Sequence, residues 1–271
     1  MTIDPANARQ LESLLRRHRI TLQHRLGQNF LIDPEVRDVI ADEAGLRQRD
    51  EVLEVGAGVG TLTIALAPRC RRLVAVELDA SLLPALYEVV KEHANVEVVQ
   101  ADILRLDVKA EIVVGNIPYN LTGALIRKVL DHSPRPRRIA LVVQKEVAER
   151  WTAPTSASLS TVVVQVFTEP RLELIIPAAK FTPSPKVDSA LVVLEVRAVP
   201  AVKVEDLGAF FRFVEALFKF RRKQLGGIMA RAGASREMLV EMEIDPTRRP
   251  QTLTLAEWEK LFRAVNRAAD R

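Results

Sequence analysis

The chain has 271 residues, of which 48% are hydrophobic and 27% charged, enough to bury a sizeable core under a charged surface. It contains no apolar run near the roughly 20 residues that span a bilayer, no apolar leader stretch at its start, and one cysteine, Cys70. A single cysteine excludes an intrachain disulfide, and together these features predict a cytoplasmic protein without membrane or metal-thiolate chemistry.

Basic residues are unevenly distributed along the chain. Residues 1–199 contain 25 basic and 25 acidic side chains, whereas residues 200–271 contain 14 and 10 and so hold the whole net charge of +4. A second basic cluster near the start is opposed by Glu12 alone and consists of Arg9, Arg16, Arg17, Arg19 and Arg25. Two basic regions around a neutral middle are typical of a protein with a polyanionic partner, although charge alone favours ordinary solvated helix faces.

Residues 51–143 alternate between short β-branched runs and stretches with helical spacing. The expected strands are Glu51–Val55, Leu73–Glu77, Val96–Gln100, Glu111–Gly115 and Ile139–Val143. The expected helices between them are Thr61–Ala67, Leu82–Lys91 and Leu121–Asp131. Strands that alternate with helices, and that are apolar at consecutive positions, predict an α/β fold with a mostly parallel sheet covered by helices on both faces.

The pattern changes after residue 143. Glu173–Ile176 and Ala190–Arg197 are expected strands, and the proline-rich stretch Pro177–Pro185 between them is an expected loop. Because no helix separates them, the two strands predict an antiparallel hairpin at one edge of the sheet. Val162–Phe167 fits either a strand, by its β-branched content, or a helix that begins after Ser158.

Beyond residue 200 the pattern is helical. The expected helices are Leu207–Phe220, Arg236–Glu241 and Leu255–Ala268. Ser235 and Thr254 are expected N-caps, and Thr254 with Glu257 three residues later has the form of a capping box. We therefore expect an α/β domain over residues 1–199 and a small all-α domain over residues 200–271.

A glycine-rich turn follows the first strand of the alternating region and opens the next helix. Gly56, Gly58 and Gly60 let a ligand approach the backbone without meeting a Cβ atom. The spacing differs from the G-x-G-x-x-G of dinucleotide sites, and Glu54 before the turn would repel a pyrophosphate. An acid here instead suits S-adenosylmethionine, which carries an ammonium and a sulfonium but no phosphate. A tight turn without a ligand is the alternative.

Two further acids follow the next strands. Glu77 ends the second strand and can accept both hydroxyl protons of a ribose. Asp102 follows the third strand, where it can receive the exocyclic amine of the cofactor's adenine. Either residue alone fits a helix cap or a surface charge. Ligands of open α/β sheets bind at the carboxyl ends of the strands, so acids at three successive strand ends predict a cofactor site at that edge.

The tetrapeptide Asn116-Ile117-Pro118-Tyr119 follows the fourth strand at the same edge. The amino group of adenine is a poor nucleophile until acceptors hold its N–H bonds and free its lone pair. The side-chain oxygen of Asn116 and the carbonyl oxygen of Ile117 can be those acceptors, since Pro118 disfavours helical geometry at the residue before it. Tyr119 offers a ring on which an extruded base can stack. The tetrapeptide resembles the Asn-(Pro/Ile/Leu)-Pro-(Tyr/Phe) motif of enzymes that methylate exocyclic amines of bases.

Four further segments resemble the ribosomal small-subunit RNA adenine dimethyltransferase family, of the bacterial kasugamycin-sensitivity type. They are Arg25–Asp33, Gln144–Arg150, Phe181–Ser189 and Phe218–Leu225, and the similarity runs over nearly the whole chain. The resemblance implies a Rossmann-like S-adenosylmethionine methyltransferase sheet with a small C-terminal all-α domain. It also implies the reaction, which converts two adjacent adenosines near the 3′ end of small-subunit (16S) ribosomal RNA to N6,N6-dimethyladenosine.

The resemblance assigns roles to individual residues. Asn29 and Leu31 are expected to close over the cofactor. The remaining cofactor contacts that it implies are Gly56, Glu77, Asp102 and Asn116, and the glycine turn adds Gly58 and Gly60 as expected cofactor-binding residues. Phe181 is expected to face Tyr119 across the target base. The basic run Arg221-Arg222-Lys223 is expected to follow RNA phosphates, so that RNA affinity falls with salt.

The family's partner is small-subunit ribosomal RNA or a precursor of the 30S particle, and we expect this chain to act on it as a monomer without a metal. The four histidines have no metal-ligand spacing and are His18, His24, His93 and His132. The chain departs from the family after Arg150, where Ala153–Ser160 lacks the usual tyrosine and arginine. This loop is expected near the RNA entrance, and its departure puts the details of RNA contact in question.

Other functions fit part of the pattern. A DNA adenine methyltransferase shares the chemistry of the tetrapeptide, but Arg25–Asp33, Phe181–Ser189 and the short helical domain argue against it. A large-subunit ribosomal RNA adenine methylase of the antibiotic-resistance type shares most of the motifs. A non-enzymatic ribosome assembly factor on the same scaffold is the third alternative, against which the complete set of acids and the tetrapeptide argue.

Overall fold

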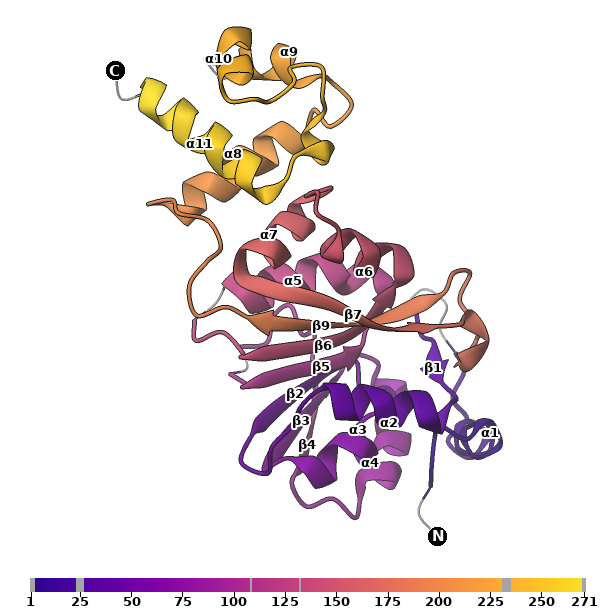
Figure 1. Ribbon diagram of the computed structural model, residues 1–271. Coiled ribbons are helices and arrows are strands. Elements are labelled where there is room, and N and C mark those ends of the chain that lie inside the picture. The colour runs from indigo at the N-terminus through magenta and orange to yellow at the C-terminus, as the bar shows by residue number, and fades with distance from the viewer. Residues whose placement is uncertain (1–2, 23–26, 108, 132, 231–234, 270–271) are drawn as a thin grey trace. The chain divides into compact units, whose positions relative to one another are not determined.

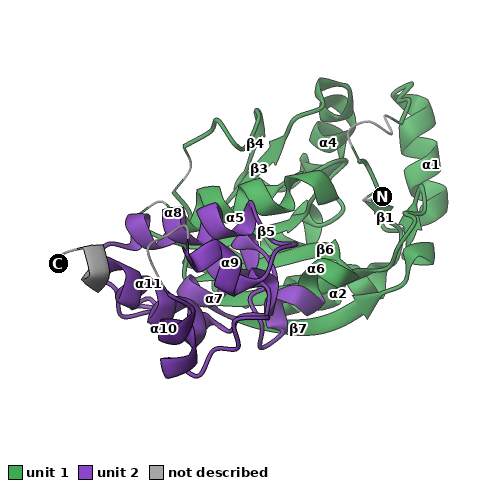
Figure 2. Ribbon diagram, turned by 90° about the horizontal axis from the view of Figure 1, so that it is seen from above, with its two compact units in different colours: residues 1–148, 170–196 green, residues 149–169, 197–271 purple. Residues whose placement is uncertain are grey.

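A computed structural model describes residues 3–22, 27–107, 109–131, 133–230 and 235–269 of the chain. Arg25 and Leu26, which begin the N-terminal family segment, lie outside the described residues, as do His24 and His132. The chain divides into two compact units, residues 1–148 with 170–196 and residues 149–169 with 197–271 (Figure 2). This division differs from the sequence-based boundary near residue 199, because residues 149–169 belong with the C-terminal helices.

A seven-stranded sheet, counted over the described residues, forms the centre of the first unit (Figure 1). Its strand order is β4-β3-β2-β5-β6-β9-β7. The strands are β2 Glu51–Val55, β3 Arg72–Glu77, β4 Val96–Gln100, β5 Ile112–Asn116, β6 Arg138–Gln144, β7 Thr168–Ile176 and β9 Ser189–Val196. The first five pair in parallel, and β9 pairs antiparallel with β6. The expected α/β architecture with an antiparallel edge is confirmed.

The central strands of the sheet are buried on both faces. Val52, Leu73 and Ile112 lie on one face with Ile40 and Leu66 packed against them, and each is at most 1% exposed. The alternate residues Leu53 and Val113 point to the other face and are buried as well. Consecutive apolar residues are therefore required in these strands, which is why the strands could be recognised in the sequence.

The α-helices up to residue 152 precede or follow these strands in the sequence. They are α1 Ala8–Arg17, α2 Pro34–Glu43, α3 Thr63–Leu66, α4 Leu83–Val90, α5 Thr122–Asp131 and α6 Lys145–Thr152. Short 3₁₀ turns are η2 Ala67–Arg69, η3 Ala80–Leu82, η4 Tyr119–Leu121 and η5 Ala178–Lys180. Figure 1 shows α2, α3 and α4 together along one side of the sheet. Helix α1 packs Leu11 and Leu14 against Leu82 and Leu86 at the end of that layer.

Two segments of the late sequence differ from expectation. The stretch expected to be a loop contains the short strand β8, Phe181–Thr182, which pairs antiparallel with β1, Phe30–Leu31. The ambiguous segment forms helix α7, Leu159–Phe167. Its helical state is favoured by Ser158, whose hydroxyl accepts a hydrogen bond from the Thr161 amide at 3.2 Å as an N-cap.

The second unit is helical in its C-terminal part. It contains α7, α8 Leu207–Phe218, α9 Leu225–Met229, α10 Arg236–Glu241, the turn η7 Pro250–Thr252 and α11 Leu255–Ala269. The expected capping box is confirmed, because the Thr254 amide donates to Glu257 at 2.7 Å and the Glu257 amide donates to the Thr254 hydroxyl at 3.3 Å. Aromatic rings from α8 and α11, among them Phe210 and Trp258, form its core.

The segment that departs from the family, Ala153–Ser160, is built into this second unit. Thr155 forms an antiparallel bridge with Thr254, and the Ser156 amide donates to the Leu253 carbonyl at 2.7 Å. The Ser156 hydroxyl is buried against Gln165. The segment therefore supports the start of α11. Among the described residues, no helix is long and apolar enough to cross a membrane.

Candidate active site

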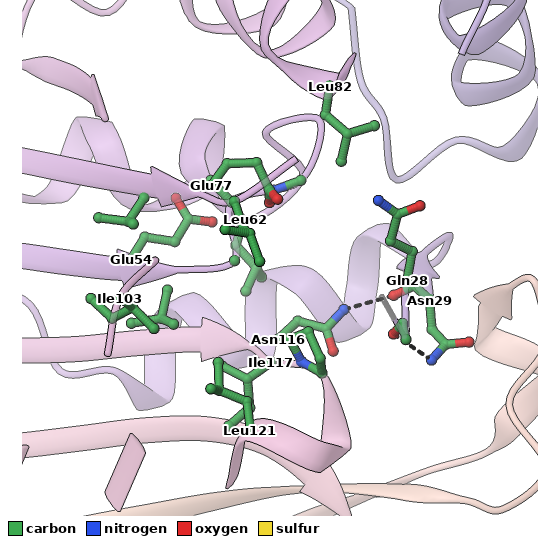
Figure 3. Close-up of a pocket in the computed structure, with 18 of the residues that line it drawn as sticks. Gln28, Asn29, Glu54, Leu62, Glu77, Leu82, Ile103, Asn116, Ile117 and Leu121 are labelled. Carbon is green, nitrogen blue, oxygen red and sulfur yellow. Dashed lines mark hydrogen bonds between the residues drawn. The ribbon is translucent and has the colours of Figure 1, made fainter. Parts of the chain in front are cut away.

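A deep cavity opens at the carboxyl ends of β2, β3, β4 and β5 (Figure 3). It encloses about 1040 Å³ including its open mouth, which is enough for a nucleoside-sized ligand. Most of the residues selected from the sequence line it, namely Asn29, Leu31, Gly56, Gly58, Glu77, Asp102, Asn116, Ile117, Pro118 and Tyr119. Residues that sequence reasoning missed also line it, among them Gln28, Phe30, Leu62, Leu82, Ile103 and Leu121.

The glycine turn shapes one wall of this cavity. Gly56 and Gly58 have φ angles of +72° and +60°, which side-chain-bearing residues rarely adopt. The Gly58 amide donates to Oε2 of Glu77 at 2.8 Å, so the turn and the end of β3 are joined directly. Gly60 does not line the cavity. A Cβ atom at Gly60 would lie 2.9 Å from Cγ1 of Val89, so this third glycine is explained by close packing on α4 rather than by a ligand contact.

Glu77 lies at the end of β3 with its carboxylate held in place. Gly58 donates to one carboxylate oxygen and the Asp79 amide donates to the other, both at 2.8 Å. Burial raises the pKa of Glu77, and these amide bonds oppose the rise. Each oxygen keeps a lone pair for a further donor, so the carboxylate can accept from a vicinal diol such as a ribose.

Glu54 lines the cavity beside Glu77, from the neighbouring strand β2 (Figure 3). Its carboxyl group is 1% exposed, and burial raises its pKa to about 8, with Glu77 contributing like-charge repulsion. Its Oε2 atom has no hydrogen-bond partner among the described residues. A buried acid without a counter-charge fits a cavity whose ligand supplies positive charge. The sequence indicated Glu54 as an acid before the glycine turn. The structure shows that it lines the cavity.

Asp102 lies just after β4 at the cavity edge. One of its oxygens accepts from the Leu104 amide at 2.9 Å, and Arg105 lies 3.6 Å from the other. The residue therefore makes a local turn and also lines the cavity. Next to it, the side chain of Ile103 is 6% exposed and gives this part of the cavity an apolar surface. An acid beside an apolar wall can receive the amino group of a purine.

Asn116 ends β5 and is oriented by the N-terminal segment. Its Nδ2 donates to the backbone carbonyl of Asn29 at 2.9 Å (Figure 3). A carbonyl oxygen can only accept, so this bond fixes the nitrogen on that side and leaves the Oδ1 acceptor available to a ligand. Asn29 donates its own side-chain amide to Gly27 at 3.1 Å, and Gln28 donates to Asp79 at 2.7 Å. Residues 27–31 thus form a strap along the cavity, and Asn29 and Leu31 belong to it.

Tyr119 follows in the turn η4. Its hydroxyl lies 2.7 Å from the hydroxyl of Ser189, the first residue of β9. Burial raises the pKa of Tyr119, and the bond to Ser189 opposes this rise, so the phenol stays neutral at physiological pH. The ring lines the cavity, where it can stack on a planar ligand.

Phe181 begins the short strand β8. Its side chain is 2% exposed and packs in the hydrophobic core with Ile40 and Val142. The pairing of β8 with β1 places Phe181 opposite Leu31 and holds it beneath the strap. It is not among the described residues that line the cavity, and its role toward a target base stays a prediction.

The basic run Arg221-Arg222-Lys223 belongs to the second unit and is exposed. It lies in the turns after α8, which ends at Phe218, rather than on a helix. The Lys223 ammonium lies 5.7 Å from the ring centroid of Phe220. Among the described residues, no group of three or more histidine, cysteine or acidic side chains is arranged to hold a metal ion.

The chain is similar to known proteins over nearly its whole length. The family model for ribosomal RNA adenine dimethylase matches residues 19–267. Ribosomal RNA small subunit methyltransferase A of Pelotomaculum thermopropionicum is 39% identical, over 93% of this chain and 94% of that protein. The protein of that name from Bacillus pumilus is 34% identical over 99% of both chains.

Two solved structures have the same fold. A dimethyladenosine transferase from Plasmodium falciparum superposes with a TM-score of 0.74 at 24% identity, over 88% of this chain and 98% of that one. The 23S rRNA methyltransferase ErmE superposes with a TM-score of 0.72 at 30% identity, over 88% of this chain and all of that one. With its match to the family model over nearly the whole length, the chain belongs to the ribosomal RNA adenine dimethylase family.

Proposed function

We propose that the chain transfers methyl groups from S-adenosylmethionine to N6 of two adjacent adenosines near the 3′ end of 16S ribosomal RNA, giving N6,N6-dimethyladenosine during small-subunit assembly. The observation that carries the proposal is the amide of Asn116, whose nitrogen is held by Asn29 so that its oxygen can accept from an amine in the cavity. Relatives named as small-subunit methyltransferases, at 33–39% identity, support the choice of ribosomal subunit.

The residues of the cavity fit S-adenosylmethionine, which supplies a methyl carbon activated by its sulfonium. Glu77 would accept the ribose hydroxyls, and Asp102 would receive the adenine amine beside the apolar side chain of Ile103. Glu54, which is buried and whose Oε2 has no hydrogen-bond partner among the described residues, gives the cationic part of the cofactor a compensating acid. No phosphate-binding group is needed, in keeping with the acidic walls.

The tetrapeptide acts on the acceptor amine. Asn116 Oδ1 and the carbonyl of Ile117 accept its N–H bonds, so that the nitrogen lone pair is directed toward the methyl donor. The neutral ring of Tyr119 stacks on the extruded base. A strong general base is not required, because the amine proton becomes acidic only after the nitrogen has gained a methyl group and a positive charge. Methyl transfer is accelerated by positioning and by exclusion of water.

RNA recognition is assigned to the second unit. Its exposed run Arg221-Arg222-Lys223, with the half-exposed Phe220 beside it, supports contact with RNA phosphates. We further propose that the acceptor is a precursor of the 30S particle, that the chain acts on it as a monomer, and that it does so in the cytoplasm. The basic excess of residues 200–271 supports the RNA contact.

An acceptor assay tests the proposal against a second candidate, methylation of 23S ribosomal RNA, which the similarity to ErmE favours. The protein is incubated with radiolabelled S-adenosylmethionine and unmodified small subunits, naked 23S RNA or duplex DNA, and the labelled nucleoside is identified. N6,N6-dimethyladenosine from small subunits alone is the expected product. Label in 23S RNA or in DNA would instead assign to the protein the activity of a related methyltransferase. Cofactor binding without label in any acceptor would leave a non-enzymatic assembly role.

A further inference from the structure

Ser189 is a buried residue outside the cavity whose hydroxyl contacts Tyr119 of the proposed site. It is 0% exposed and is not among the described residues that line the cavity. Its hydroxyl lies 2.7 Å from that of Tyr119. Because Ser189 begins β9 and pairs with Gln144 of β6, its backbone is fixed by the sheet. The hydroxyl is thus a fixed point against which the tyrosine can be oriented.

The segment before Ser189 is braced as well. The Asp188 side chain accepts from the Ala178 amide, and the Asp188 carbonyl accepts from the Lys145 amide, both at 3.0 Å. The backbone at Ala178 and at Lys145 is therefore tied to the residue just before β9. Such bracing restricts movement of the Ser189 hydroxyl relative to the sheet edge.

Tyr119, by contrast, belongs to the three-residue turn η4, which has no side-chain cap. A short 3₁₀ turn restrains its side chains weakly. The hydroxyl contact with Ser189 is the hydrogen bond through which the far end of the ring is tied to the sheet. Without it, the far end of the ring loses this connection to the sheet.

We propose that Ser189 is a positioning residue for methyl transfer, which fixes the Tyr119 hydroxyl, and with it the far end of the ring, relative to the target adenine. The proposal rests on the function proposed above. Ser189 acts only through Tyr119 and touches neither substrate nor cofactor. In the same way, the carbonyl of Asn29 sets the orientation of Asn116, so that each of the two polar side chains of the tetrapeptide has one anchor outside it.

The proposal predicts a defect in the chemical step. A displaced ring still binds the base but holds its amine away from the attack geometry, so the rate constant falls more than the affinity. Ser189→Ala and Tyr119→Phe remove the same bond. Each is expected to lower the single-turnover rate constant about five- to tenfold, the effect of losing roughly one hydrogen bond. Since the bond is lost only once, the double variant should be no slower than either single variant.

The test compares these three variants and the wild type on unmodified small subunits at saturating S-adenosylmethionine, with KM for subunits, cofactor affinity and thermal unfolding measured in parallel. Thr168→Val is the matched control. Thr168 is also 0% exposed, and its hydroxyl donates to the Val164 carbonyl at 2.8 Å, away from the cavity lining. The control should lose stability to a similar degree while its rate constant stays at the wild-type value.

Three outcomes would overturn the positioning role. One is a wild-type rate constant in Ser189→Ala or Tyr119→Phe, and the second is full additivity in the double variant. The third is an equal loss of rate in Thr168→Val, which would attribute the defect to stability. If Ser189→Ala does not fold, Tyr119→Phe alone still decides between the first outcome and the prediction. An inactive wild type would instead reject the proposed function, on which this role depends.

Discussion

Glu54 and Glu77 bring two carboxyl groups to adjacent strand ends in one buried wall, and burial raises the pKa of both. Glu54 has the weaker compensation, because its Oε2 lacks a partner among the described residues whereas Glu77 accepts two amide bonds. The protein is therefore expected to hold Glu54 protonated near neutral pH until a cation enters the cavity.

This protonation predicts a pH dependence of stability in the ligand-free protein. The folded state keeps the Glu54 proton up to a pKa of about 8, whereas the unfolded chain releases it near 4.5. The folded state binds the extra proton in this interval, so Glu54 makes the free energy of unfolding fall as pH rises from 4.5 to 8. Glu54→Gln keeps the shape but cannot ionise, so urea unfolding at pH 5, 6.5 and 8 should show a shallower decline. Equal slopes in wild type and variant would contradict the assignment.

Single residues of the site were predictable to different degrees. Asn116 ends β5, and Tyr119 and Asp102 come shortly after β5 and β4, so short-range sequence order is enough to bring them to one sheet edge. Ser189 and Gln28 contact Tyr119 and Asp79 across long stretches of chain, and no local pattern signals such pairs. The packing of Phe181 in the core was not predicted for the same reason, because the pairing of β8 with β1 determines what it packs against.

The turn between β2 and α3 combines ligand approach with packing. Gly58 faces the cavity, whereas Gly60 faces α4, where a Cβ would meet Val89 and Leu86. Gly123, near the start of α5, offers a contrast because no atom lies within 4 Å of its would-be Cβ.

Alanine substitutions at these two glycines should have opposite effects. Gly60→Ala places a side chain at a φ of +91° and against the Val89 side chain, and should lower the free energy of unfolding by about 1–3 kcal/mol. Gly123→Ala lies in a helix with room for the methyl group and should raise it by roughly 0.5–1 kcal/mol. Urea denaturation of both variants measures the difference. Destabilisation of equal size at both positions would refute the packing argument.

Elements were predictable where burial alone determines the pattern. The central strands of the sheet are apolar at consecutive positions. The capping box of Thr254 and Glu257 indicates the start of α11. Helix α9, Leu225–Met229, was not predicted, because its two glycines oppose helix formation and only tertiary packing of Leu225 and Met229 stabilises it. Strand β8 was not predicted, because the prolines around it favoured a loop.

In the molecule as a whole, the proposed methyl-transfer site and the excess of basic residues belong to different units. The cavity belongs to the sheet-containing unit, whereas Arg221-Arg222-Lys223 belongs to the other. The departure from the family at Ala153–Ser160 also falls in the second unit, where Thr155 and Ser156 support the start of α11. The proposed division of labour gives the second unit RNA contact without a role in cofactor binding.

Charge removal tests this division. Arg221→Ala combined with Arg222→Ala should weaken binding to small-subunit RNA and reduce the magnitude of the slope of log affinity against log salt by about two, if each arginine neutralises one phosphate. Affinity for S-adenosylmethionine should not change. The control pair, Arg47→Ala with Arg49→Ala, lies on an exposed connection at the amino end of β2, opposite the cavity edge. RNA titrations at several salt concentrations in which both pairs behave alike would rule out specific contact.

The cavity that carries Asn116 is the proposed site of adenine methylation. The most direct test measures single-turnover methylation of unmodified small subunits by the wild type and by Asn116→Ala at saturating S-adenosylmethionine, with cofactor binding and folding verified for both. The wild type should form N6,N6-dimethyladenosine. The variant should be slower by at least about 100-fold, because the amine loses the acceptor that orients its lone pair. A folded, cofactor-bound Asn116→Ala protein that methylates at the wild-type rate would contradict the account.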